Sequence, residues 1–239
     1  MSTAGAIARR ELGAYFRAPA GWIIISLFLF LTGIVFAVSA LTPGQPASLR
    51  AFFSAAGWLL LPVAPAISMR LLAEEFRAGT IESLLTAPVT GWSLVIGKFL
   101  AGLSFLILMV APTVLYPIIL VAISDPAPDL GPILAGYLCL VLLGAFYVGI
   151  GVLASATTSN ATLAFLMTFF VILLLLFAGV GGRFVPDQLK PFLYELSVSA
   201  RVSDFAKGII ELTHVVFFVS AASICVVAAA ALVELRRWS

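Results

Sequence analysis

The sequence predicts an all-α protein that crosses a membrane six times, and its composition and charge distribution carry this prediction. Hydrophobic residues make up 62% of the 239 residues and charged residues only 10%, whereas soluble domains are roughly half apolar and about one quarter charged. The charged residues are clustered, so that long uncharged runs separate them. This pattern excludes a water-soluble fold and indicates a single transmembrane domain over residues 1–239.

The uncharged runs define where the spans lie. A helical span needs about 20 apolar residues, and the runs place spans at approximately 20–41, 51–69, 93–123, 132–154, 161–181 and 212–233. Pro112 and Pro117 predict a kink in the third span. The polar stretch from Ser155 to Asn160 predicts the break between the fourth and fifth. The first run is longer than the roughly 7–15 apolar residues of a secretory signal, so we expect it to remain as a span.

The distribution of Lys and Arg predicts which ends face the cytoplasm. Six spans place both termini on one side, and a cytoplasmic N-terminus puts eight of the 13 Lys and Arg residues inside and five outside. Because cytoplasmic loops carry the excess of these residues, we expect a multi-pass protein of the cell inner (plasma) membrane with both termini cytoplasmic. The alternative of five spans would place Arg236 and Arg237 outside. The net charge of +2 provides no basic field for nucleic acid.

The spans contain few groups that could couple transport to an ion gradient, because such coupling needs residues that change charge within the membrane. Only Lys98 and His214 qualify, and both lie near span ends. We expect Lys98 to extend to the inner headgroups and His214 to lie at the outer interface. The segment from Gly91 to Phe99 does not match a nucleotide-binding loop, because its glycine spacing is wrong and Phe99 replaces the magnesium-binding Ser or Thr. We therefore expect a non-catalytic chain with no metal and no cofactor of its own.

Two alternative classes of function remain open. A secondary transporter or channel needs polar residues that face one another in the membrane, and the spans offer only mild candidates: Ser104, Thr113, Thr168 and Ser220. An intramembrane enzyme needs a catalytic constellation, and a single His without a metalloprotease or hydrolase motif provides none. Activity of the purified chain on a lipid or peptide, without any ATPase, would support an enzyme.

The N-terminal stretch from Ile7 to Arg17 predicts an amphipathic helix in the membrane interface. Its apolar residues fall broadly on one side of a helix, and three arginines lie beside them: Arg9, Arg10 and Arg17. A basic amphipathic helix of this kind lies among the lipid headgroups.

The loop between the second and third spans predicts a short helix of its own. Gly79 fits a helix stop and Thr80 an N-cap. Glu82 would lie in the first turn, where the helix dipole favours an anion, and Pro88 ends the segment. The helix has an apolar side formed by Ile81, Leu84 and Leu85. A solvated connector does not need such a side, so we expect a docking partner.

The segment between the fifth and sixth spans predicts an amphipathic element at the outer side. Four apolar residues recur at spacings of four, three and four, and so line one side of a helix: Val198, Val202, Phe205 and Ile209. Residues 183–212 carry four basic and four acidic residues. We expect this element to lie against the outer span ends, either as an outer gate over an exit path or as a cover for apolar surface.

Two stretches resemble a known family. Residues 69–99, MRLLAEEFRAGTIESLLTAPVTGWSLVIGKF, look like the motif of type-2 ABC-exporter permeases. Residues 204–220, DFAKGIIELTHVVFFVS, are similar to the branch that includes gliding-motility and nitrous-oxide-reductase maturation permeases.

The resemblance implies a membrane-spanning permease subunit that uses ATP hydrolysis by a separate ATPase for substrate export or force transmission. The loop helix would be a coupling helix, with a transmission element formed by Glu74, Glu75, Arg77, Gly79, Thr80 and Glu82. The resemblance also implies a second permease subunit, identical or homologous, and two ATPase subunits that hold ATP and Mg. Residues 183–212 would be the outer re-entrant gate, and membrane lipid and an extracytoplasmic accessory protein would be further partners.

Overall fold

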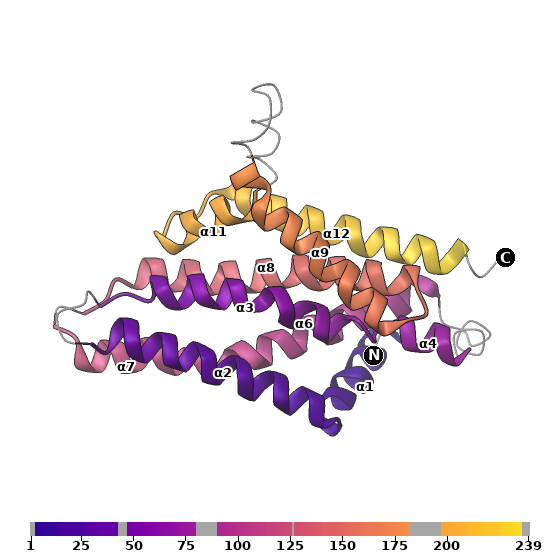
Figure 1. The fold of residues 1–239 in the computed structure, drawn as a ribbon, viewed down its shortest axis with the longest axis horizontal. Helices are drawn as coiled ribbons and strands as arrows, with labels where there is room; N and C mark the ends of the chain where they lie inside the picture. The colour runs from indigo at the N-terminus through magenta and orange to yellow at the C-terminus, as the bar shows by residue number, and fades with distance from the viewer. Residues whose placement is uncertain (1–2, 43–46, 80–89, 126, 182–196, 236–239) are drawn as a thin grey trace.

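The computed structural model describes residues 3–42, 47–79, 90–125, 127–181 and 197–235, and in these residues the only regular secondary structure is helical (Figure 1). The all-α prediction is therefore confirmed. In chain order the elements are α1 (Thr3–Arg17), α2 (Pro19–Ala40), α3 (Arg50–Ser68), α4 (Ala73–Ala78), α6 (Gly91–Val110), η1 (Ala111–Val114), α7 (Leu115–Ile123), α8 (Leu130–Thr157), α9 (Ala161–Gly181), α11 (Val198–Ala206) and α12 (Leu212–Leu235).

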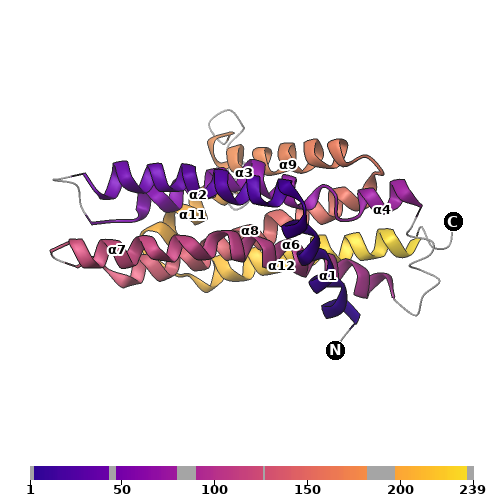
Figure 2. The same cartoon turned by 90° about the horizontal axis from the view of Figure 1, so that it is seen from below.

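Six helical stretches in the described part of the chain are long and apolar enough to cross a membrane. They are α2, α3 continued by α4, α6 continued through η1 and α7, α8, α9 and α12. The bundle has an α4 end, on the right in Figure 1, and an α7 end on the left. The short helix α1 runs obliquely across the bundle instead of along it (Figure 2).

Pro112 interrupts the helix of the third span as expected, whereas Pro117 lies within the continuous helix α7. Pro112 lies in η1, a 3₁₀ turn between α6 and α7. Proline lacks the backbone N–H that an α-helix needs and clashes with the preceding turn, so the helix tightens locally and then resumes at Leu115.

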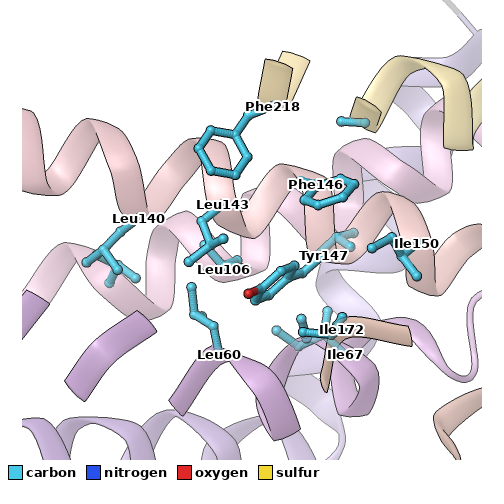
Figure 3. Close-up of a cluster of buried hydrophobic side chains, with 14 of the residues drawn as sticks. Leu60, Ile67, Leu106, Leu140, Leu143, Phe146, Tyr147, Ile150, Ile172 and Phe218 are labelled. Carbon is cyan, nitrogen blue, oxygen red and sulfur yellow. The ribbon is translucent and has the colours of Figure 1, made fainter. Parts of the chain in front are cut away.

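Helix α8 lies at the centre of the bundle and is the most buried of the six spans. Its Tyr147 is fully buried and contacts a cluster that includes Leu60, Leu106 and Ile172 from neighbouring helices (Figure 3). The glycines of α8 allow this packing. A Cβ at Gly144 would lie 2.6 Å from Leu106, closer than real contacts permit, so this pair of helices approaches at a residue without a side chain.

The break between the fourth and fifth spans begins later than predicted. Ser155 was expected to start it, but α8 continues through Thr157. The actual turn is Thr158 to Asn160, where the Asn160 side chain accepts a hydrogen bond of 2.9 Å from the backbone N–H of Thr162. Ser155 thus lies within α8, and its hydroxyl forms hydrogen bonds with the turn between α3 and α4.

The helix α11 packs beside α3, α8 and α9. Val198 and Phe205 are fully buried and Val202 is half-buried, so these three share the predicted apolar side. The prediction for Ile209 is wrong. The helix ends at Ala206, Gly208 follows in a left-handed conformation with φ 85°, and Ile209 lies outside the helix and is 48% exposed.

Candidate functional site

A group of charged side chains lies at the α4 end, and the buried Lys98 is at its centre. Lys98 is in the second turn of α6, and only 2% of its side chain is exposed. Its Nζ lies 2.8 Å from Oε1 of Glu75 in α4 and 3.6 Å from Oε1 of Glu11 in α1. The expectation that Lys98 extends to the lipid headgroups is wrong, because two carboxylates hold its ammonium group inside the protein.

Arg10 completes this group, which we call the inner charge cluster: Arg10, Glu11, Glu75 and Lys98. Arg10 Nη2 donates a 2.8 Å hydrogen bond to Glu11 Oε1 and lies 3.7 Å from Glu75 Oε1. That hydrogen bond is the main reason why the pKa of Arg10 is raised above its ordinary value. The two positive and two negative groups balance. Such balance is what makes burial of a charge tolerable, since an isolated buried ion is strongly disfavoured.

The helix α1 brings two of these four residues to the site, and its position depends on Gly97. A Cβ at Gly97 would lie 2.8 Å from both the Ala4 carbonyl oxygen and Ile7 Cβ, so only glycine allows this contact between α1 and α6. The predicted amphipathic helix is thus present, and its arginines are exposed at Arg9, Arg10 and Arg17.

Tyr15 fixes the other end of α1 against the spans. Its ring stacks on Phe105 with centroids 4.7 Å apart, and its hydroxyl donates a 2.5 Å hydrogen bond to the carbonyl of Ile67 in α3. Burial raises the pKa of the Tyr15 hydroxyl, so it remains a hydrogen-bond donor at any physiological pH. The α1 helix therefore contacts both α6 and α3.

The base of α4 is fixed by a hydroxyl from α8. The backbone N–H groups of Leu72 and Ala73 donate to Ser155 Oγ at 3.0 and 2.9 Å, and Ser155 Oγ donates to the carbonyl of Met69 at 3.2 Å. These N–H groups begin a helix and have no partner within it. A side chain from another helix satisfies them, so the turn between α3 and α4 is joined to α8.

The opposite side of α4 is exposed. Glu74 and Arg77 are exposed, and Glu74 forms an ion pair of 3.4 Å with the equally exposed Arg70. Gly79 ends the helix in the left-handed conformation with φ 66°, as predicted, because a glycine adopts it without steric cost. Thr80 and Glu82 lie outside the described residues, as does the predicted helix that they would begin.

Glu75 therefore differs from the other predicted transmission residues. It was expected to form part of a surface offered to a partner, but its side chain is only 15% exposed and points to Lys98 and Arg10. Reasoning from sequence assigned neither Glu11 nor Ser155 to this site. The one available signal was Lys98 itself, a lysine with apolar neighbours on both sides that needed a counter-ion.

A second polar group lies where α11 meets α12. The ring of His214 has Nδ1 2.9 Å from Arg201 Nη1, and its Nε2 lies 3.5 Å from Asp204 and 3.7 Å from Glu211. The Arg201 guanidinium also lies 4.0 Å from the centre of the Phe217 ring. These contacts join α11 to the first turns of α12. Within the described ranges, no group of three His, Cys, Asp or Glu residues could hold a metal ion.

Residues 5–192 match the family described as ABC-2 family transporter protein. The match covers most of the chain, so the protein belongs to the ABC-2 transporter family and is a membrane permease of that class. No curated protein matches the sequence significantly.

Proposed function

We propose that this chain is the membrane-spanning subunit of an ABC exporter and that a separate ATPase binds at the α4 end. The attachment of α4 carries this proposal. One side of α4 is joined to α1 and α6 through Glu75 and to α8 through Ser155, while the other side is exposed. A partner that displaced α4 would therefore displace three other helices with it.

The partner supplies the chemistry in this proposal. The described residues of this chain contain no nucleotide-binding motif, so ATP and Mg bind in the ATPase subunits, two per complex, with a second permease subunit that is identical or homologous. The exposed contact residues are Glu74, Arg77 and Gly79, and we place Thr80 and Glu82 in the same contact. The run 204–220 supports placing the chain near the gliding-motility and nitrous-oxide-reductase maturation branch.

The proposal requires that the α4 end faces the cytoplasm. The excess of Lys and Arg in the segments at that end supports this orientation. Trp22 and Trp92 indicate that a membrane interface lies at the α4 end. Each is exposed in the first turn of a span there, and tryptophans concentrate at membrane interfaces.

Single-cysteine labelling tests this orientation. In a variant in which alanines replace Cys139 and Cys225, a cysteine at Ala78 should react with a membrane-impermeant maleimide only after the cells are permeabilised. A cysteine at Asp125, at the α7 end, is the matched control and should react in sealed cells. Labelling of position 78 in sealed cells would refute the orientation and with it the proposed ATPase contact.

We also propose that α11 acts as the outer gate. Support comes from its position: Val202 lies beside Gly57 and lines a cavity together with Leu176 of α9. The helix thus occupies space between spans instead of lying above them, and it would have to shift for a substrate to pass there.

A disulfide between cysteines at Val202 and Leu176 tests the gate. If α11 must move, the oxidised double variant should lose ATP-driven transport, and reduction should restore it. Each single cysteine variant under the same oxidation is the control. Full transport with the disulfide complete would show that α11 merely covers apolar surface.

A further inference from the structure

A cavity of about 340 Å³ lies between α3, α8, α9 and α11, and its lining is divided by chemistry. One part is polar and basic and is formed by Arg50, Ser54, Ser199, Ser203 and Lys207. The other part is apolar and includes Trp58, Leu143, Leu176 and Val202. The volume falls in the range of small-molecule sites, which are about 300–1,000 Å³.

The charges of the polar part are positive. Arg50 and Lys207 are the only ionisable residues in the lining, and no carboxylate faces the cavity among the residues that the structure describes. Lys207 is paired with Asp204 at 3.2 Å, outside the lining, which offsets its charge. Arg50 is exposed and has no ion pair with any described residue, so within the described part of the chain nothing offsets its charge.

The apolar part lies deeper in the spans. Leu143 is near the middle of α8 and is fully buried, while Leu176 of α9 is almost so. Trp58 forms the edge of this part, is 51% exposed, and meets the ring of Phe177 with centroids 6.1 Å apart. A ligand in this cavity would thus place one end against a guanidinium and hydroxyls, and the other against leucine and tryptophan side chains.

We propose that this cavity binds an anionic amphiphile, with its head group on Arg50 and the adjoining serines and its apolar body against Trp58, Leu143 and Leu176. A guanidinium binds carboxylate or phosphate oxygens through charge-assisted hydrogen bonds. A wholly polar anion would leave the apolar wall uncovered, and an uncharged hydrocarbon would leave Arg50 without a partner. The head group can belong either to a membrane lipid or to a free amphiphile. The site needs no ATPase, so it stands or falls separately from the proposed coupling.

Quenching of Trp58 fluorescence tests the site directly. The probe is 9,10-dibromostearate, whose bromines quench nearby tryptophan, added to the full-length protein in nanodiscs of zwitterionic phosphatidylcholine. The difference in quenching between the unaltered protein and Trp58→Phe is the quenching of Trp58. We expect this difference to saturate as dibromostearate is added. With the uncharged methyl ester of the same acid, we expect it to rise gradually without saturation.

Two pairs of variants locate the probe. Arg50→Gln should weaken apparent binding roughly tenfold, as expected for loss of a charged hydrogen bond, and Arg50→Lys should retain most of it. Gly57→Leu should abolish saturable quenching by filling the cavity. Gly57→Ala is its matched control, because a Cβ there would lie 3.8 Å from Leu143 and 3.9 Å from Val202, at ordinary contact distance.

The source of the head group is distinguished by nanodiscs that contain dibrominated lipids. Specific quenching of Trp58 by dibrominated phosphatidylglycerol, but not by phosphatidylcholine, assigns the site to an anionic lipid. Saturable quenching by dibromostearate alone assigns it to a free amphiphile. Equal quenching by acid and ester, or identical titrations of Arg50→Gln and the unaltered protein, would overturn the proposal. If Gly57→Leu fails to insert, the Arg50 pair still decides.

Discussion

Replacing Lys98 with methionine should destabilise the protein by about 3–5 kcal/mol, because it leaves the largely buried carboxylate of Glu75 without its nearest cation. The ion pair between Glu75 and Arg10 would remain, but at a longer distance of 3.7 Å. The change keeps the length and apolar stem of the side chain, so it removes charge more than volume. Thermal unfolding can be followed through reaction of a thiol-reactive dye with Cys139, which is buried in the folded protein.

A double-mutant cycle separates the ion pair from general damage. The double variant with Lys98→Met and Glu75→Gln should be more stable than Lys98→Met alone. Both positions are then uncharged, so the lost lysine no longer leaves a carboxylate at position 75 without its partner. Arg70→Met is the matched control: its ion pair with Glu74 is more than half exposed on the Arg70 side and contributes little. Equal effects of Lys98→Met and Arg70→Met would show that the inner charge cluster does not hold the α4 end together.

Gly151→Ala should have the second large effect, because Gly151 of α8 lies against Ser68 of α3 with no room for a Cβ. An added Cβ would overlap Ser68 Oγ and Cβ, and Ser68 Cβ cannot move without its helix. Overpacking of this kind costs about 1–3 kcal/mol and sometimes more. Ser155 lies one turn further along α8, so separation of the helices should also weaken its hydrogen bonds to Leu72 and Ala73.

The expected result is a lower unfolding temperature and faster proteolysis near α4. Gly57→Ala, at another α3–α8 contact where a Cβ has ordinary clearance, should leave both unchanged. Adding Ser68→Gly to Gly151→Ala removes the overlapping atoms and should restore the attachment of α4, apart from about 1 kcal/mol for a glycine within a helix. A Gly151→Ala protein as stable as Gly57→Ala would mean that α3 and α8 are not held at this distance.

The positions of the spans and some of the helix ends follow from local information. Uncharged runs locate the spans because a charge inside a lipid-exposed helix is costly, and Pro112 and Gly79 change the backbone through their own chemistry. These features need no knowledge of the partner helices. For this reason the interruption by η1 and the end of α4 could be predicted, and the end of α11 was misjudged only because Gly208 was not considered.

The connections of the site depend on residues far apart in the chain. Ser155 is 82 positions from Ala73, and Lys98 pairs with carboxylates from two separate helices. A lone lysine near a span end is compatible with a headgroup contact or with a buried ion pair, and the choice depends on how α1 crosses the bundle. That crossing requires Gly97 to face α1, a contact that no periodicity in the sequence specifies.

These contacts give a physical account of how a force on α4 would reach the membrane. Glu75 connects α4 to α6, Glu11 connects α1 to α6, and Ser155 connects the start of α4 to α8. Buried ion pairs and satisfied backbone groups resist separation, because separation would leave charges or donors unpaired inside the protein. Movement of α4 alone is therefore disfavoured relative to movement with its neighbours.

Site-specific photo-crosslinking in native membranes tests the central claim most directly. A photoreactive benzophenone amino acid at Arg77, on the exposed side of α4, should crosslink to one ATP-binding subunit that mass spectrometry identifies by its nucleotide-binding motif. The same amino acid at Asp125, at the α7 end, should not. Crosslinking of an ATPase at position 125 and not at 77, or a complex purified intact without any ATP-binding subunit, would contradict the account.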